Sequence, residues 1–115
     1  MKYLCLVYQD ETLLQNKSKE ETDKMNAEEW AFAEVTQDSG QLIVGHELQP
    51  THTATTVRVR NGKTLTTAGP FAETREQIGG FYLIEANDFN DAIRVASRIP
   101  NARLGSIEVR PILAY

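Results

Sequence analysis

The fold of this chain is decided by a stretch near its middle, residues 55–67, with the sequence Thr-Thr-Val-Arg-Val-Arg-Asn-Gly-Lys-Thr-Leu-Thr-Thr. Valine and arginine alternate before Asn61-Gly62, which is typical of a strand whose two faces differ. Both central positions of a type I′ turn need a positive φ angle, and Asn-Gly adopts this turn readily. We therefore predict a β-hairpin with strands at residues 53–60 and 63–67.

The residues before the hairpin predict a strand, a helix and a second strand. Residues 2–8 are apolar on both alternating faces, as in a central strand. A polar loop is expected at residues 9–17. Ser18, with a glutamate three residues later, is a capping-box signature for a helix that runs to about Ser39. Residues 42–44 form a short apolar strand.

The residues after the hairpin predict the same sequence of elements. Residues 80–86 alternate as a strand, and Asp88 is placed to cap a helix that ends before Pro100. The apolar residues of that helix recur at helical spacing. Residues 106–110 alternate again as a closing strand.

The order of these elements predicts an α+β fold, the ferredoxin-like βαββαβ plan with an inserted β-hairpin. At 115 residues the chain is expected to be a single domain spanning 1–115. Both helices would cover one face of the sheet. A second copy of the same sheet is the simplest cover for the other face, so we expect a homodimer.

Composition limits the functional classes. A net charge of −4 argues against direct nucleic-acid binding, which needs a basic surface. Cys5, the one cysteine, has no partner for an internal disulfide and is expected to be a small buried apolar residue. Without a signal-peptide pattern or an apolar run of membrane-spanning length, the expected location is the cytoplasm, with no membrane contact.

The two histidines are the first candidates for chemistry. His46 lies at a strand end beside Glu47, and it is the candidate acid–base residue. Neighbouring residues of a strand point to opposite faces, so these two are not a ready pair. His52 lies in a polar stretch after a proline and is the weaker candidate. The spacing of acidic residues and histidines fits no metal site, and no nucleotide-binding motif is present, so we expect neither a metal nor a cofactor.

Two groups of charged residues are candidate ligand contacts. Arg58 and Arg60 share one face of the hairpin and could bind an anion, or they could form a solvated edge with cross-strand ion pairs. The second group lies between Thr67 and Phe81, a segment that is too charged for a core. It carries Gly69, Pro70, Phe71, Glu73 and Arg75.

That segment could bind a ligand, as functional loops often do, or bridge to a partner subunit. The pair Gly79-Gly80 ahead of the following strand is expected to permit a β-bulge or a close approach of the backbone.

The segment Gly69-Pro70-Phe71-Ala72-Glu73-Thr74-Arg75-Glu76-Gln77-Ile78-Gly79-Gly80-Phe81-Tyr82 resembles the YCII-related proteins of the DGPF-domain group. The hairpin at residues 55–63 and the closing strand at residues 105–111 are also similar to that group. The resemblance implies a dimeric α+β barrel. It implies little about activity, although some members of the group are associated with extracytoplasmic-function sigma factors.

Two positions depart from the family pattern. Ala68 stands where the DGPF motif has its aspartate, and the first long helix lacks the histidine of the His–Asp pair in the broader YCII family. The resemblance therefore supplies neither partner of that pair to this chain.

From these observations we expect a small polar or anionic molecule to bind between the helices and the sheet. His46 would be the acid–base residue of a lyase, isomerase or dehalogenase-like reaction, with Arg58, Arg60 or Arg75 holding the anion. The alternative is a non-catalytic regulatory or interaction module that associates with a sigma factor.

Overall fold

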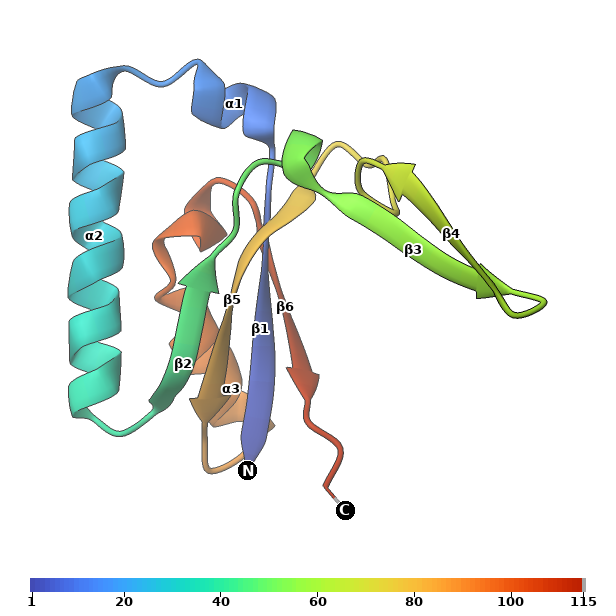
Figure 1. Ribbon diagram of the computed structural model, residues 1–115. Helices are drawn as coiled ribbons and strands as arrows, with labels where there is room; N and C mark the ends of the chain where they lie inside the picture. The colour runs from blue at the N-terminus through green and yellow to red at the C-terminus, as the bar shows by residue number, and fades with distance from the viewer. Residues whose placement is uncertain (115) are drawn as a thin grey trace.

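The computed structural model describes residues 1–114 and contains a four-stranded antiparallel sheet (Figure 1). The strands lie in the order β2-β5-β1-β6, so β1 and β5 are central. Their bounds are Lys2–Gln9 for β1, Leu42–Glu47 for β2, Gln77–Glu85 for β5 and Ser106–Pro111 for β6. This order confirms the predicted α+β class and is that of a ferredoxin-like fold.

Within residues 1–114, the α-helices are α1 (Glu11–Gln15), α2 (Lys19–Asp38) and α3 (Phe89–Ser97), and the short 3-10 helices are η1 (Thr51–Thr53) and η2 (Pro100–Arg103). The predicted capping box is present at the start of α2, because the Ser18 hydroxyl accepts from the backbone N–H of Glu21 at 3.1 Å. Asp88 caps α3 as predicted. None of these helices is long and apolar enough to cross a membrane.

The core lies on the face of the sheet that the helices cover. Alternate residues of β1 point into it and meet residues of α3 and one phenylalanine of α2. The buried apolar residues are Tyr3, Cys5, Val7, Phe32, Ile84, Ala86, Ala92, Val95, Ala96 and Ile99. The expected burial of Cys5 is confirmed, and this burial raises the pKa of its thiol to about 11.

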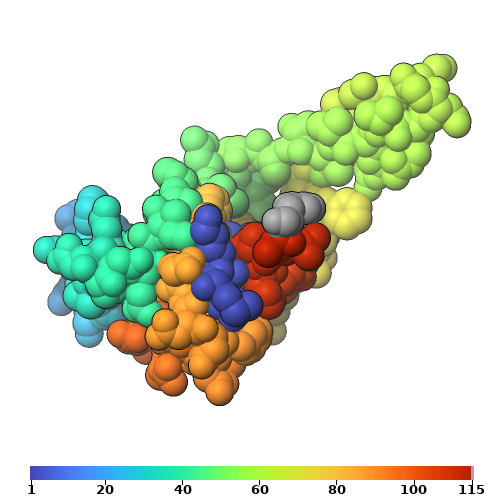
Figure 2. Space-filling view, turned by 90° about the horizontal axis from the view of Figure 1, so that it is seen from below, coloured from blue at the N-terminus to red at the C-terminus, as the bar shows by residue number. Residues whose placement is uncertain are grey.

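The hairpin forms an arm outside the main sheet. Among the described residues, its strands β3 (Thr55–Arg60) and β4 (Lys63–Ala68) pair only with each other, and Figures 1 and 2 show the arm projecting from the body. Asn61 and Gly62 have φ angles of 51° and 73°, which confirms the predicted turn chemistry. The arm raises the radius of gyration to 16.0 Å, against about 13 Å for a compact domain of this size.

The predicted polar loop at residues 9–17 is wrong in part, because it contains α1. The Asp10 side chain accepts hydrogen bonds from the backbone N–H groups of Thr12 and Leu13 and so caps this helix. Asp10 as the N-cap residue, with Glu11 in the first turn, is a local sequence signal for the start of a helix. The signal is weak because the helix has only five residues and none of them is buried.

Tyr82 of β5 connects α2 to the sheet. Its ring packs edge-on against Phe32, with the centroids 5.2 Å apart, and its hydroxyl donates to Glu29 Oε2 at 2.7 Å. Gly45 on the neighbouring strand leaves the space for this ring, since a Cβ there would lie 2.5 Å from Tyr82 Cδ1 and 3.0 Å from Cε1. The contact between α2 and the sheet therefore requires glycine at position 45.

We predict that Gly45→Ala destabilises the protein by about 1–3 kcal/mol, because the added methyl group displaces the Tyr82 ring. Urea denaturation followed by circular dichroism measures the change. Ser106→Ala, at an exposed strand position, is the control and should stay within about 0.5 kcal/mol of the wild type. Equal stability of Gly45→Ala and the control would contradict this account of Tyr82.

Candidate functional site

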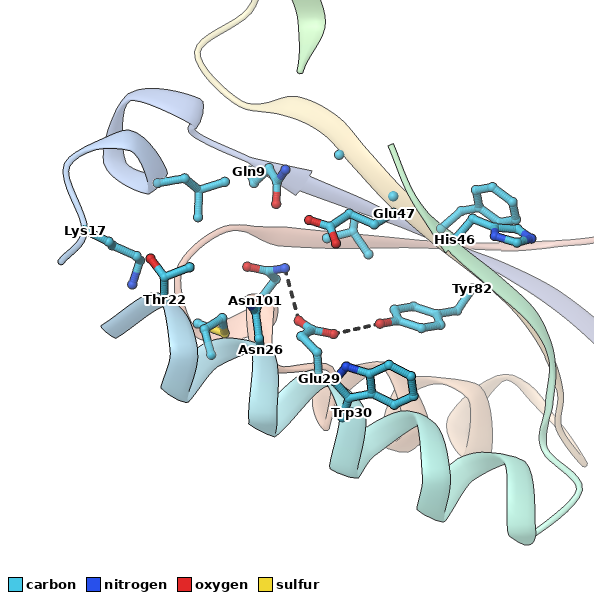
Figure 3. Close-up of a pocket in the computed structure, with 16 residues that line it drawn as sticks. Gln9, Lys17, Thr22, Asn26, Glu29, Trp30, His46, Glu47, Tyr82 and Asn101 are labelled. Carbon is cyan, nitrogen blue, oxygen red and sulfur yellow. Dashed lines mark hydrogen bonds between the residues drawn. The ribbon is translucent and has the colours of Figure 1, made fainter. Parts of the chain in front are cut away.

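A cavity of about 450 Å³ lies between the N-terminal half of α2 and the strands β1, β2 and β5 (Figure 3). The helix contributes residues spaced three or four apart, which therefore share one face. The residues that line the cavity are Val7, Gln9, Leu14, Lys17, Thr22, Met25, Asn26, Glu29, Trp30, His46, Glu47, Gly79, Gly80, Phe81, Tyr82 and Asn101.

Glu29 is the centre of a hydrogen-bonded cluster in this cavity. Its Oε2 accepts from the Tyr82 hydroxyl at 2.7 Å, and its Oε1 accepts from Asn101 Nδ2 at 3.2 Å. The three side chains come from α2, β5 and η2, and Figure 3 shows them converging. Two fixed donors therefore hold the carboxylate in one orientation.

Burial raises the pKa of Glu29 above its ordinary value of 4.5, because a charged carboxylate loses water contacts there. The hydrogen bond from Tyr82 opposes this effect, whereas the charges of Glu47 and Glu28 add to it. Burial and the Glu29 carboxylate also raise the pKa of Tyr82, so its hydroxyl stays protonated as a donor. A carboxyl group with a raised pKa in a cavity has the properties of an acid–base group.

Glu47 and His46 point to opposite sides of β2, as the strand alternation predicts. Glu47 is paired with Gly80 and points into the cavity, whereas His46 is paired with Phe81. The imidazole packs against the Phe81 ring with a centroid distance of 5.9 Å, and Figure 3 shows it turned away from Glu29. His46 borders the cavity, but its ring lies on the other face of the sheet from the Glu29 cluster.

The two glycines of β5 shape the cavity wall. The register between β1 and β5 shifts at Gly79, since Val7 pairs with Gly80 and Tyr8 pairs with Ile78. The predicted β-bulge is therefore confirmed. A Cβ on Gly80 would lie 2.9 Å from the carbonyl oxygen of His46, so the close approach of the strands also needs glycine there.

The arginines of the hairpin lie on the arm, away from the Glu29 cluster. The Arg58 guanidinium lies 5.4 Å from the centroid of the Phe71 ring, close enough for a cation–π contact. Arg60 is exposed next to the turn, and its guanidinium donates to the Val59 carbonyl oxygen at 3.0 Å. The structure thus brings Arg58 together with Phe71 but brings neither arginine to His46.

The remaining predicted residues belong to the segment between the arm and β5. Gly69 has a φ of 101° and ends the arm, and Pro70 and Phe71 line a separate groove of about 550 Å³. Glu73 is exposed. Arg75 Nε lies 3.2 Å from Asp10 Oδ2 and so forms an ion pair with the N-cap residue of α1.

The residues that sequence reasoning missed are Glu29, Tyr82 and Asn101. Tyr82 and Asn101 lie 53 and 72 positions after Glu29 along the chain, so no local sequence pattern connects them to it. The sequence offers no signal for them, because the exposure of Trp30 beside Glu29 is known only from the structure. Among residues 1–114, no group of three or more side chains is placed to hold a metal ion.

Comparisons with known proteins identify the family of this chain. The model of the YCII-related domain family matches residues 1–115. An uncharacterized protein of Rhizobium meliloti (strain 1021) is 38% identical over 117 residues, an alignment that covers 100% of this chain and 94% of the relative. The chain therefore belongs to the YCII-related domain family.

Proposed function

We propose that this protein binds a small polar molecule in the cavity between α2 and the sheet, with Glu29 as the acid–base group. The observation that carries the proposal is the Glu29 carboxylate, held by Tyr82 and Asn101 inside a cavity of about 450 Å³. Small-molecule sites are usually concave, with a few polar groups that converge and an ionisable residue whose pKa is perturbed.

The reaction class that fits this geometry is proton transfer, as in an isomerase or a lyase. Glu29 keeps its proton to a higher pH than an ordinary carboxyl group, so it can exchange a proton with a bound molecule nearer to neutral pH. Glu29 replaces His46 as the proposed acid–base residue, because the imidazole faces away from the cluster.

We also propose that the protein is a homodimer in which a second copy covers the open face of the sheet. Leu4, Leu6 and Tyr8 of β1 point to that face, and Phe81 and Leu83 of β5 are their cross-strand neighbours. These side chains remain partly exposed in the single chain. Burying them is favourable by about 25 cal/mol for each Å² of apolar surface.

Leu6→Glu should convert the dimer to a monomer, because the new carboxylate would be buried beside Phe81 and opposite Glu108. Sedimentation velocity measures the change in mass. Val35→Glu is the control, since Val35 is an exposed apolar residue of α2, and this variant should keep the mass of the wild type. A wild-type protein that sediments as a monomer would refute the dimer.

A thermal-shift screen of polar metabolites tests the proposed binding. A molecule present at a hundredfold excess over its Kd stabilises the folded state by about 2.7 kcal/mol. We expect a molecule that binds in the cavity to raise the melting temperature of Glu73→Ala, since Glu73 lies outside the cavity, but not that of Glu29→Ala. A molecule that stabilises both variants equally would show that it binds elsewhere.

The exposed arm favours a second candidate function, that of an interaction module for a sigma factor. Val57 and Val59 are 59% and 58% exposed and lie on one uncharged face of the arm. Such a surface suits a protein partner. A pull-down with the purified protein tests this function. It is favoured if a sigma factor is captured by the Glu29→Ala variant but not by the double variant Val57→Ser/Val59→Ser.

A further inference from the structure

The ionisable groups of the cavity are unevenly distributed. Glu29 and Glu47 both line it, whereas Lys17 is the one lysine among the described lining residues. Figure 3 places Lys17 with Thr22 at one end, and Glu29 with Trp30 and Tyr82 at the other. One end of the cavity is therefore both acidic and aromatic.

The guanidinium groups near this region are engaged outside the cavity. Arg103 pairs with Glu28, the neighbour of Glu29, and Arg75 pairs with Asp10. Within residues 1–114, no arginine lines the cavity. An anionic ligand would therefore meet two carboxylates at the acidic end without the bidentate donors that proteins use to bind anions.

Two aromatic rings flank the carboxylates. Trp30 is 77% exposed although it lines the cavity, so much of its indole surface is free to contact a bound molecule. The Tyr82 ring is fixed by Phe32 and by its hydrogen bond to Glu29. Aromatic faces attract ammonium groups, tryptophan most strongly, and sites for quaternary ammonium ions are commonly built this way.

We propose that the ligand of this cavity is a small organic cation, whose ammonium group lies between the carboxylates of Glu29 and Glu47 and against the rings of Trp30 and Tyr82. This inference rests on the proposed function and names its ligand class. The carboxylate of Glu29 accepts two hydrogen bonds within the protein, and a carboxylate has about four lone-pair sites, so it can still face a cation.

Three probes of similar size that share a group with three methyls, but differ in charge, test the inference. They are choline, its neutral isostere 3,3-dimethylbutan-1-ol and the anion 3,3-dimethylbutanoate. Trp30 is the one tryptophan of the chain, so its fluorescence reports directly on this cavity. We expect choline to give a saturable change in emission and to bind at least tenfold more tightly than the alcohol, with the anion weakest.

Variants assign the effect to the carboxylates. Glu29→Gln and Glu47→Gln should each weaken choline binding about tenfold while changing the affinity for the alcohol less than twofold, because charge is removed and shape is kept. Glu28→Gln is the matched control, since Glu28 is adjacent in sequence but pairs with Arg103 outside the cavity. It should bind choline like the wild type.

The outcomes separate the two proposals. If the alcohol or the anion binds as tightly as choline, the cation inference is wrong and the proposed small-molecule site stands. If none of the three probes changes the Trp30 emission in a saturable way, the cation inference is wrong, and the proposed small-molecule site is then decided by the thermal-shift screen with Glu29→Ala. If choline binds but Glu29→Gln and Glu47→Gln bind it like the wild type, the carboxylates do not hold the cation and the inference is overturned.

Discussion

The contact of Tyr82 with α2 is the constraint on which the rest of the structure depends. One side chain packs against Phe32 and donates to Glu29, residues one turn apart on the helix, and its ring fits only because position 45 is glycine. The buried residues of α2, Phe32 and Thr36, lie toward its C-terminal end. The N-terminal half is held near the sheet without filling the space beneath it, and that space is the cavity.

The parts of the fold that could be predicted from the sequence are those with local causes. Asn61-Gly62 specifies its turn through backbone φ angles, and Ser18 starts α2 through a hydrogen bond three residues away. The Glu29–Tyr82 hydrogen bond has no such local cause, because it joins a helix and a strand across 53 positions of the chain. In the sequence Glu29 is one acidic residue among many on a polar helix.

The charged segment between the arm and β5, residues 69–76, does not line the cavity. Arg75 forms an ion pair with the N-cap of α1, and Phe71 packs against Arg58 of the arm, so both have structural partners. The helix α2 contains no histidine, and it supplies Glu29 to the cavity. A carboxyl group with a raised pKa can perform the same kind of proton transfer as an imidazole.

The most direct test of this account is a ¹³C NMR titration of the Glu29 side-chain carboxyl, assigned by comparison with Glu29→Gln. Burial and the charges of Glu47 and Glu28 should place its pKa above 4.5 in the free protein. Saturating choline should lower that pKa, because a nearby cation favours the charged carboxylate. A pKa at or below 4.5 that choline leaves unchanged would contradict the account.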